Sequence, residues 1–115
     1  MTGNEYQIAA LRTTGTDDNA ALLVNGVLGL CGETGEVADL VKKFEFQGHQ
    51  LDPQKLAEEL GDVAWYLAVT ASAIGYDLDS IFQMNIDKLR KRYPAGFDAE
   101  RSIHRPEYEG GLNHV

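Results

Sequence analysis

Two pairs of acidic residues constrain this chain more than any other feature. Glu33 and Glu36 form one pair, and Glu59 and Asp62 form the other. Residues three apart lie on one face of an α-helix about one turn apart, so each pair would direct two like charges the same way. Such repulsion has no value for folding beside an apolar stripe. A bound hard cation would explain it.

The acidic pairs border apolar stripes when each segment is projected at about 100° per residue. Both pairs lie on the same edge of their own stripe. Packing of the two stripes against each other would therefore bring the four carboxylates together at the rim of a core, in the outline of a metal site. The stripes consist of Leu30, Val37, Val41 and Phe44 in one segment, and Leu56, Val63, Leu67 and Ile74 in the other.

In the rest of the chain, apolar residues recur at the spacing of α-helices, and no segment shows the alternation of apolar and polar residues that is typical of a buried strand. We expect an all-α fold, bundle-like, with one domain over residues 1–115, a core at about 20–97 and a tail at 98–115. Glycines 26, 29 and 32 would let another helix approach closely. So small a bundle with many apolar helix faces also favours assembly through its helices. The expected helices are 4–12, 20–46, a third that starts at an Asp52-Pro53 cap and ends near 74, and 77–92.

The net charge of −8 disfavours nucleic acid and anionic membranes as partners. A small anionic substrate would need cations to bridge it to the acids, which agrees with a metal site. No run is apolar and long enough to span a bilayer, and the N-terminus lacks the pattern of a secretory signal. We expect the single cysteine, Cys31, to be a buried, reduced thiol in a cytoplasmic protein.

A third polar group lies at Asn85, Lys88 and Arg92, where it borders the apolar stripe of its own helix. Carboxylates that hold Mg²⁺, together with lysine and arginine that hold phosphate oxygens, are what a phosphate-ester hydrolase requires. Lys43, two turns after Glu36, would either add to the phosphate clamp or be a surface charge.

Three motifs occur in order: G-E-x-G-E-V-A-D, E-E-L-G-D-V-x-W-Y-L and N-x-x-K-L-x-x-R-Y-P. Together they resemble the MazG-like nucleotide pyrophosphohydrolases of the all-α NTP pyrophosphatase superfamily, over roughly Leu22 to Phe97. The resemblance implies Mg²⁺-dependent hydrolysis of a nucleoside triphosphate between its α and β phosphates, with Mn²⁺ able to substitute. It also implies homodimers or homotetramers, and a role in cleaning the nucleotide pool.

The resemblance carries over to particular residues. It implies a phosphate-holding pair at Lys88 and Arg92, and a residue near the nucleotide at Asn85. This chain is a single module, whereas some relatives carry two in tandem, so assembly and cellular role stay open. The metal ligands that the resemblance implies are Glu33, Glu36, Glu59 and Asp62.

Several roles remain open at this point. Glu36 is a metal ligand or the general base for the attacking water, and Lys88 and Arg92 would stabilise charge on the leaving pyrophosphate. Tyr66 projects to the acidic side and is equally consistent with substrate binding and with packing, whereas Trp65 favours packing. Alternatives are a dimeric dUTPase-like enzyme, a phosphoribosyl-ATP pyrophosphohydrolase and a non-catalytic helical oligomer. A carboxylate-bridged di-iron or di-manganese bundle is disfavoured, because no histidine follows a glutamate by three residues.

Overall fold

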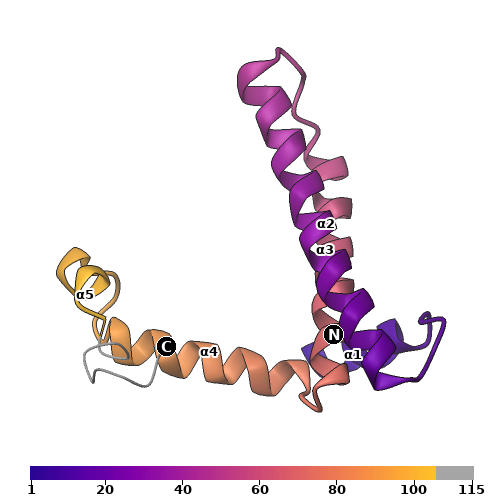
Figure 1. Cartoon of the computed structure of the whole chain (residues 1–115). Coiled ribbons are helices and arrows are strands. Elements are labelled where there is room, and N and C mark those ends of the chain that lie inside the picture. The colour runs from indigo at the N-terminus through magenta and orange to yellow at the C-terminus, as the bar shows by residue number, and fades with distance from the viewer. Residues whose placement is uncertain (106–115) are drawn as a thin grey trace. The chain divides into compact units, whose positions relative to one another are not determined.

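The computed structural model describes residues 1–105, which form five helices and no strand (Figure 1). The all-α prediction is confirmed, and the four expected helices lie within two residues of their predicted bounds. The described residues separate into two compact units: Met1–Leu78, and a second that begins at Asp79. The helices are α1 (Gly3–Leu11), α2 (Asn19–Phe46), α3 (Pro53–Ala73), α4 (Leu78–Arg92) and α5 (Ala99–Ile103).

Local signals in the sequence account for where α1 and α3 begin. Thr2 and Glu5 form a reciprocal capping box at the start of α1, with bonds of 3.0 and 3.1 Å between side chain and backbone. Asp52 accepts hydrogen bonds from the backbone of the first turn of α3, and Pro53 is its first residue, as predicted.

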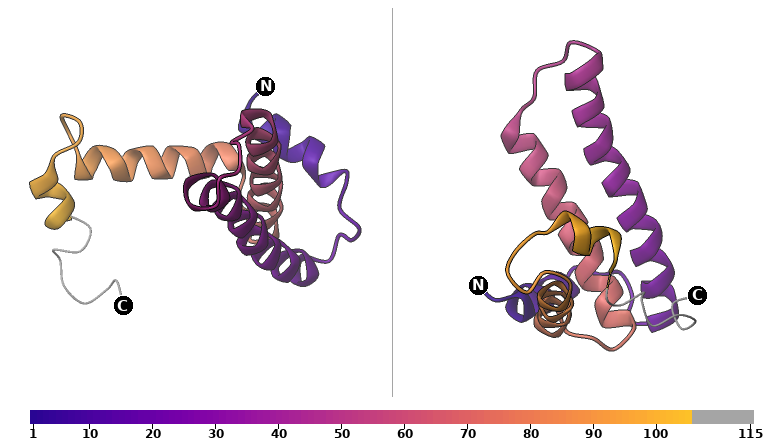
Figure 2. Two further views of the ribbon diagram at one scale, coloured as in Figure 1. Left: turned by 90° about the horizontal axis from the view of Figure 1, so that it is seen from above. Right: turned by 90° about the vertical axis from the view of Figure 1, so that its left-hand side faces the viewer.

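The helices α2 and α3 lie side by side in the first unit (Figures 1 and 2). Glycines allow this close approach, because a methyl group at Gly26 would collide with Thr70, and one at Gly29 would collide with the ring of Tyr66. At Gly32 nothing lies within 4 Å of the space that a methyl group would fill. The predicted close packing at glycine is therefore confirmed at two positions of the three.

The core of the first unit lies where α1 and α3 meet. Gln7 of α1 is buried, and its amide donates to the carbonyl oxygens of Ala68 and Tyr76, each over 3.1 Å. Its carbonyl oxygen accepts from the backbone N–H of Leu78 over 3.0 Å. One side chain thus ties α1 to the end of α3 and to the residue at which α4 begins. The buried apolar side chains are Ala10, Leu22, Ala68, Val69, Ala71 and Leu78.

The apolar stripes expected to be buried are only partly covered in the single chain. Val41 and Phe44 on α2 are 43% and 45% exposed, and Leu67 on α3 and Ile74 at its C-cap are 36% and 55% exposed. The glycine contacts of α2 are made with Thr70 and Tyr66 of α3, and the larger apolar side chains named above remain at the surface. Cys31 is also exposed, and the prediction of a buried thiol is wrong.

The second unit contains most of α4 and the short helix α5, where the sequence predicted no helix. Asp98 caps α5 by accepting from the backbone N–H of Glu100 over 3.0 Å. Arg101 on α5 donates to the carbonyl oxygens of Arg92 and Lys91, over 2.6 and 3.1 Å. These bonds satisfy carbonyl groups that the C-terminus of α4 leaves without helical partners. The remainder of the predicted tail, residues 106–115, lies outside the described residues. In the described part of the chain, no helix combines the length and the apolar character needed to cross a membrane.

Candidate metal centre

Three of the four predicted acidic ligands converge between α2 and α3. Glu33 projects from α2, and Glu59 and Asp62 project from α3. Each offers one carboxylate oxygen, and the three oxygens lie within 4.8 Å of one another. Oxygen donors this close together form the ligand set preferred by Mg²⁺ and other hard cations.

Two oxygens of this cluster lack protein partners. The Oε2 atoms of Glu33 and Glu59 are buried, and neither accepts a hydrogen bond in the described part of the chain. A buried acceptor without a partner destabilises a fold, and a charged one does so more strongly. A divalent cation between the two helices would satisfy both oxygens, so the residues present fit a metal ion.

The pKa of Glu59 is shifted because these acids lie close together. It is raised above its ordinary value, first because the protonated carboxyl can hydrogen-bond to Glu33, and then because of partial burial. Repulsion from the charges of Glu33 and Asp62 acts in the same direction, whereas a hydrogen bond with Glu36 lowers the pKa. The fourth predicted acid, Glu36, is thus near enough to influence the pKa of Glu59, although it lies outside the group of three.

A tyrosine that the sequence did not single out lies within range of the charge of Asp62. Tyr6 of α1 is half-buried, and its pKa is raised by burial and, to a lesser degree, by the charge of Asp62. Only the packing of α1 against α3 brings it there. No local motif around Tyr6 could have indicated this position.

Two open hollows flank the acids. We call one the aromatic hollow, of about 340 Å³, and the other the lysine hollow, of about 280 Å³. The aromatic hollow is lined by Glu33, Asp62, Trp65 and Tyr66. The lysine hollow is lined by Glu36, Asp39, Leu40, Lys43, Lys55 and Glu59.

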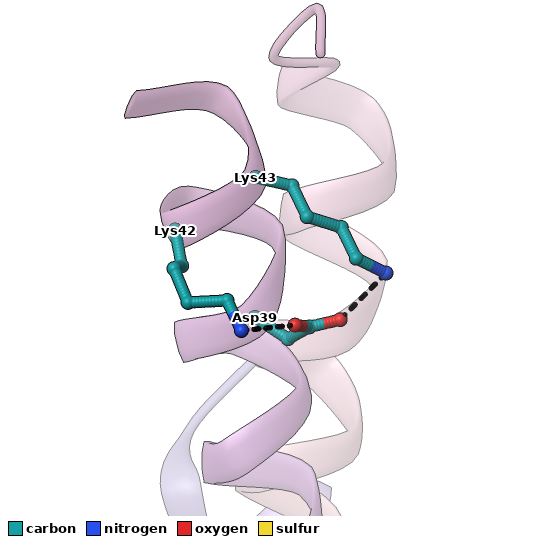
Figure 3. Close-up of polar contacts among 3 residues, drawn as sticks. All are labelled: Asp39, Lys42 and Lys43. Atoms are coloured by element: carbon teal, nitrogen blue, oxygen red, sulfur yellow. Dashed lines mark ion pairs between the residues drawn. The ribbon is translucent and has the colours of Figure 1, made fainter. Parts of the chain in front are cut away.

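Lys43, a predicted phosphate-binding residue, lies in the lysine hollow as part of an ion-pair group (Figure 3). Its Nζ lies 2.8 Å from Oδ2 of Asp39, and the Nζ of Lys42 lies 3.5 Å from Oδ1 of the same carboxylate. The hydrogen bond from Lys43 is the main reason why the pKa of Asp39 is lowered. Asp39 therefore holds the Lys43 ammonium group at the edge of the hollow.

The predicted basic residues belong to the second unit. Asn85, Lys88 and Arg92 all lie on the continuous helix α4, and Asn85 and Lys88 are exposed. Arg92 is half-buried, and its guanidinium carbon lies 5.8 Å from the centre of the Tyr93 ring. The meeting of these residues with the acids of the first unit stays a prediction.

Comparison with known proteins gives two matches. The family model of the MazG nucleotide pyrophosphohydrolase domain matches residues 25–97, which includes all four acids and the three polar residues of α4. The Gene 37 protein of Mycobacterium phage L5 is 37% identical over 100 residues, which cover 79% of this chain and 88% of that protein. No solved structure matches the chain.

Proposed function

The chain belongs to the MazG nucleotide pyrophosphohydrolase family, and from this membership we propose that it hydrolyses nucleoside triphosphates between their α and β phosphates. The products are a nucleoside monophosphate and pyrophosphate. The observation that carries this proposal is the group formed by Glu33, Glu59 and Asp62, in which two buried oxygens accept no hydrogen bond from residues 1–105. We propose that the reaction serves to remove unwanted nucleotides from the cytoplasmic pool.

Glu33, Glu59 and Asp62 would hold Mg²⁺, or Mn²⁺ in its place, with Glu36 as a fourth ligand or as the base. When bound, such an ion neutralises phosphate charge and lowers the pKa of water. The hollow that Glu36 and Glu59 line together supports a role for Glu36 at the edge of the ion site. As general base, Glu36 would accept the proton of the water that attacks the α-phosphorus.

The basic residues would act on the leaving group. Lys88 and Arg92 would stabilise the negative charge that builds on the leaving pyrophosphate, since a fixed cation acts most strongly where charge develops. Lys43 would bind a phosphate oxygen from the lysine hollow, whereas Asn85 and Tyr66 would orient the nucleotide. These assignments require α4 to approach the acids, in the same chain or in the assembled oligomer.

A pyrophosphate-release screen tests the proposed reaction. Canonical and modified NTPs and dNTPs would be offered with Mg²⁺, together with dUTP and phosphoribosyl-ATP, to separate the alternative specificities. We expect pyrophosphate without free phosphate, and a loss of at least about 100-fold in kcat for Glu36→Gln. Glu58→Gln is the matched control, because Glu58 is an exposed neighbour on α3 outside both hollows. Equal activity of Glu36→Gln and Glu58→Gln would refute the assignment of Glu36, and a non-catalytic module would show no Mg²⁺-dependent activity at all.

We also propose that the protein assembles as a homodimer or homotetramer. Support comes from the exposed apolar side chains along α2 and α3, among them Phe44 and Ile74, which a second copy would cover. Light scattering during size-exclusion chromatography would measure the mass. A monomer at all concentrations would refute this part of the proposal.

A further inference from the structure

The acids separate two hollows of different chemistry. Glu33 and Asp62 contribute to the aromatic hollow, whereas Glu36 and Glu59 contribute to the lysine hollow. Along α3, the order is Lys55, Glu59, Asp62, then Trp65 and Tyr66. Tyr66 lies eleven positions after Lys55, which is about 16 Å along a helix. A site at the acids therefore has one end where two lysines stand among carboxylates, which we call the cationic end after these lysines, and an aromatic end.

The aromatic end is held in place by contacts on two sides. The rings of Trp65 and Tyr66 meet edge to face, with centres 5.0 Å apart. The indole N–H of Trp65 donates to the hydroxyl of Thr13 over 2.8 Å, and Thr13 in turn donates to the carbonyl oxygen of Ala10. The ring of Tyr66 lies against Gly29. A preformed aromatic surface beside carboxylates suits a flat ring, because bases stack on aromatic side chains whatever their sequence.

The cationic end has one lysine in an ion pair and one without. Asp39 holds Lys43, as described above. Lys55 lies in the first turn of α3 and is exposed, and no carboxylate of residues 1–105 forms an ion pair with its ammonium group. An ammonium group that forms no ion pair within residues 1–105, in the hollow that Glu36 and Glu59 also line, is available to a phosphate that a cation bridges to those acids.

We propose that the substrate lies along α3 with its base against Trp65 and its β and γ phosphates directed toward Lys55. This inference rests on the proposed function and adds two residues to it. Trp65 becomes a base-binding residue, and Lys55 becomes a pyrophosphate-binding residue. The cleaved bond then lies at the acids, between the two ends.

Binding of the two reaction products tests the roles of Trp65 and Lys55 separately, without any catalysis. Inorganic pyrophosphate is the ligand for the cationic end. AMP and dCMP, with a purine and a pyrimidine base, are the ligands for the aromatic end. Titration calorimetry with Mg²⁺ would give Kd for each. We expect Lys55→Gln to raise the Kd of pyrophosphate about tenfold and to leave the mononucleotides within about twofold, whereas Lys55→Arg keeps the wild-type Kd. Trp65→Leu should weaken the mononucleotides about tenfold and leave pyrophosphate unchanged. Arg12→Gln, which removes an exposed charge outside both hollows, is the control.

The unaltered protein provides an independent readout, since Trp65 is the only tryptophan of the chain. Mononucleotide binding should quench its fluorescence, whereas pyrophosphate should bind with little change in emission. This measurement does not depend on the folding of any variant. Equal effects of Lys55→Gln and Trp65→Leu on both products, or quenching by pyrophosphate alone, would overturn the proposed orientation while hydrolysis of the triphosphate remained intact. If the wild-type protein neither hydrolyses nucleoside triphosphates nor binds these products, the proposed function and the orientation fall together.

Discussion

An alanine at Gly29 and an alanine at Gly32 should change stability in opposite directions. The two glycines lie on the same helix, three residues apart, and are equivalent as sequence. In the structure, a methyl group at Gly29 would overlap the Tyr66 ring, whereas at Gly32 nothing lies within 4 Å. The comparison therefore tests whether α2 and α3 are as close as the structure has them.

The magnitudes follow from two opposing effects. Alanine in place of glycine inside a helix stabilises it by about 0.5–1 kcal/mol. At Gly32 this is the whole effect, so the free energy of unfolding should rise by about that amount. At Gly29 the methyl group must displace an aromatic ring in a packed contact, at a cost of about 1–3 kcal/mol. The net result for Gly29→Ala should be a loss of about 1–2 kcal/mol.

Urea unfolding, followed by far-ultraviolet circular dichroism, would measure both variants beside the wild type. Protein concentration must be the same throughout, because the stability of an oligomer depends on it. Similar slopes with urea would show that the variants unfold to comparable ensembles. A stabilising effect of Gly29→Ala, equal to that of Gly32→Ala, would refute the close contact between Gly29 and Tyr66.

Three further predictions concern Gln7 and Glu59. Gln7→Leu should lower the free energy of unfolding by about 2–4 kcal/mol, because the N–H of Leu78 loses its buried acceptor. Urea unfolding measures this, and a loss below about 1 kcal/mol would contradict it. Without Mg²⁺, Glu59→Gln should have a melting temperature no lower than that of the wild type, because the substitution relieves repulsion between carboxylates. With Mg²⁺, the melting temperature of the wild type should rise, and that of Glu59→Gln should not. A full Mg²⁺-dependent rise in the variant would count against Glu59 as a ligand. The raised pKa of Glu59 means that the folded protein holds this proton more tightly than the unfolded chain does. That stabilisation is complete below the ordinary value of 4.5 and is lost as the pH rises through the raised value. In metal-free buffer, wild type should therefore lose stability relative to Glu59→Gln between acidic and neutral pH, and a difference that is constant with pH would exclude this account.

Local signals explain which parts of the fold were predictable. Asp52 and Pro53 mark the start of α3 through their own chemistry, and the spacing of Glu59 and Asp62 places both on one side of that helix whatever surrounds it. The approach of Glu33 to this pair also followed, because the acids border equivalent edges of two apolar stripes.

Tertiary packing explains what was not predictable. Tyr6 of α1 lies within range of the charge of Asp62, and Thr13, just after α1, bonds to Trp65, and nothing in the sequence near them indicates these approaches. Gly32 has the same spacing as Gly26 and Gly29 but faces open space. The sequence spacing of an apolar residue such as Phe44 is the same whether the residue is buried by its own chain or by a second copy of the chain.

The narrow separation of α2 and α3 has a consequence for the choice of ion. The Tyr66 ring lies against a glycine one turn before Glu33, so the packing at Gly29 helps to fix how far the oxygens of Glu33 stand from those of Glu59. An ion held by these carboxylates would have to fit a spacing that two helices impose, so discrimination between small and large divalent cations would depend on the helix contact as well as on the carboxylates.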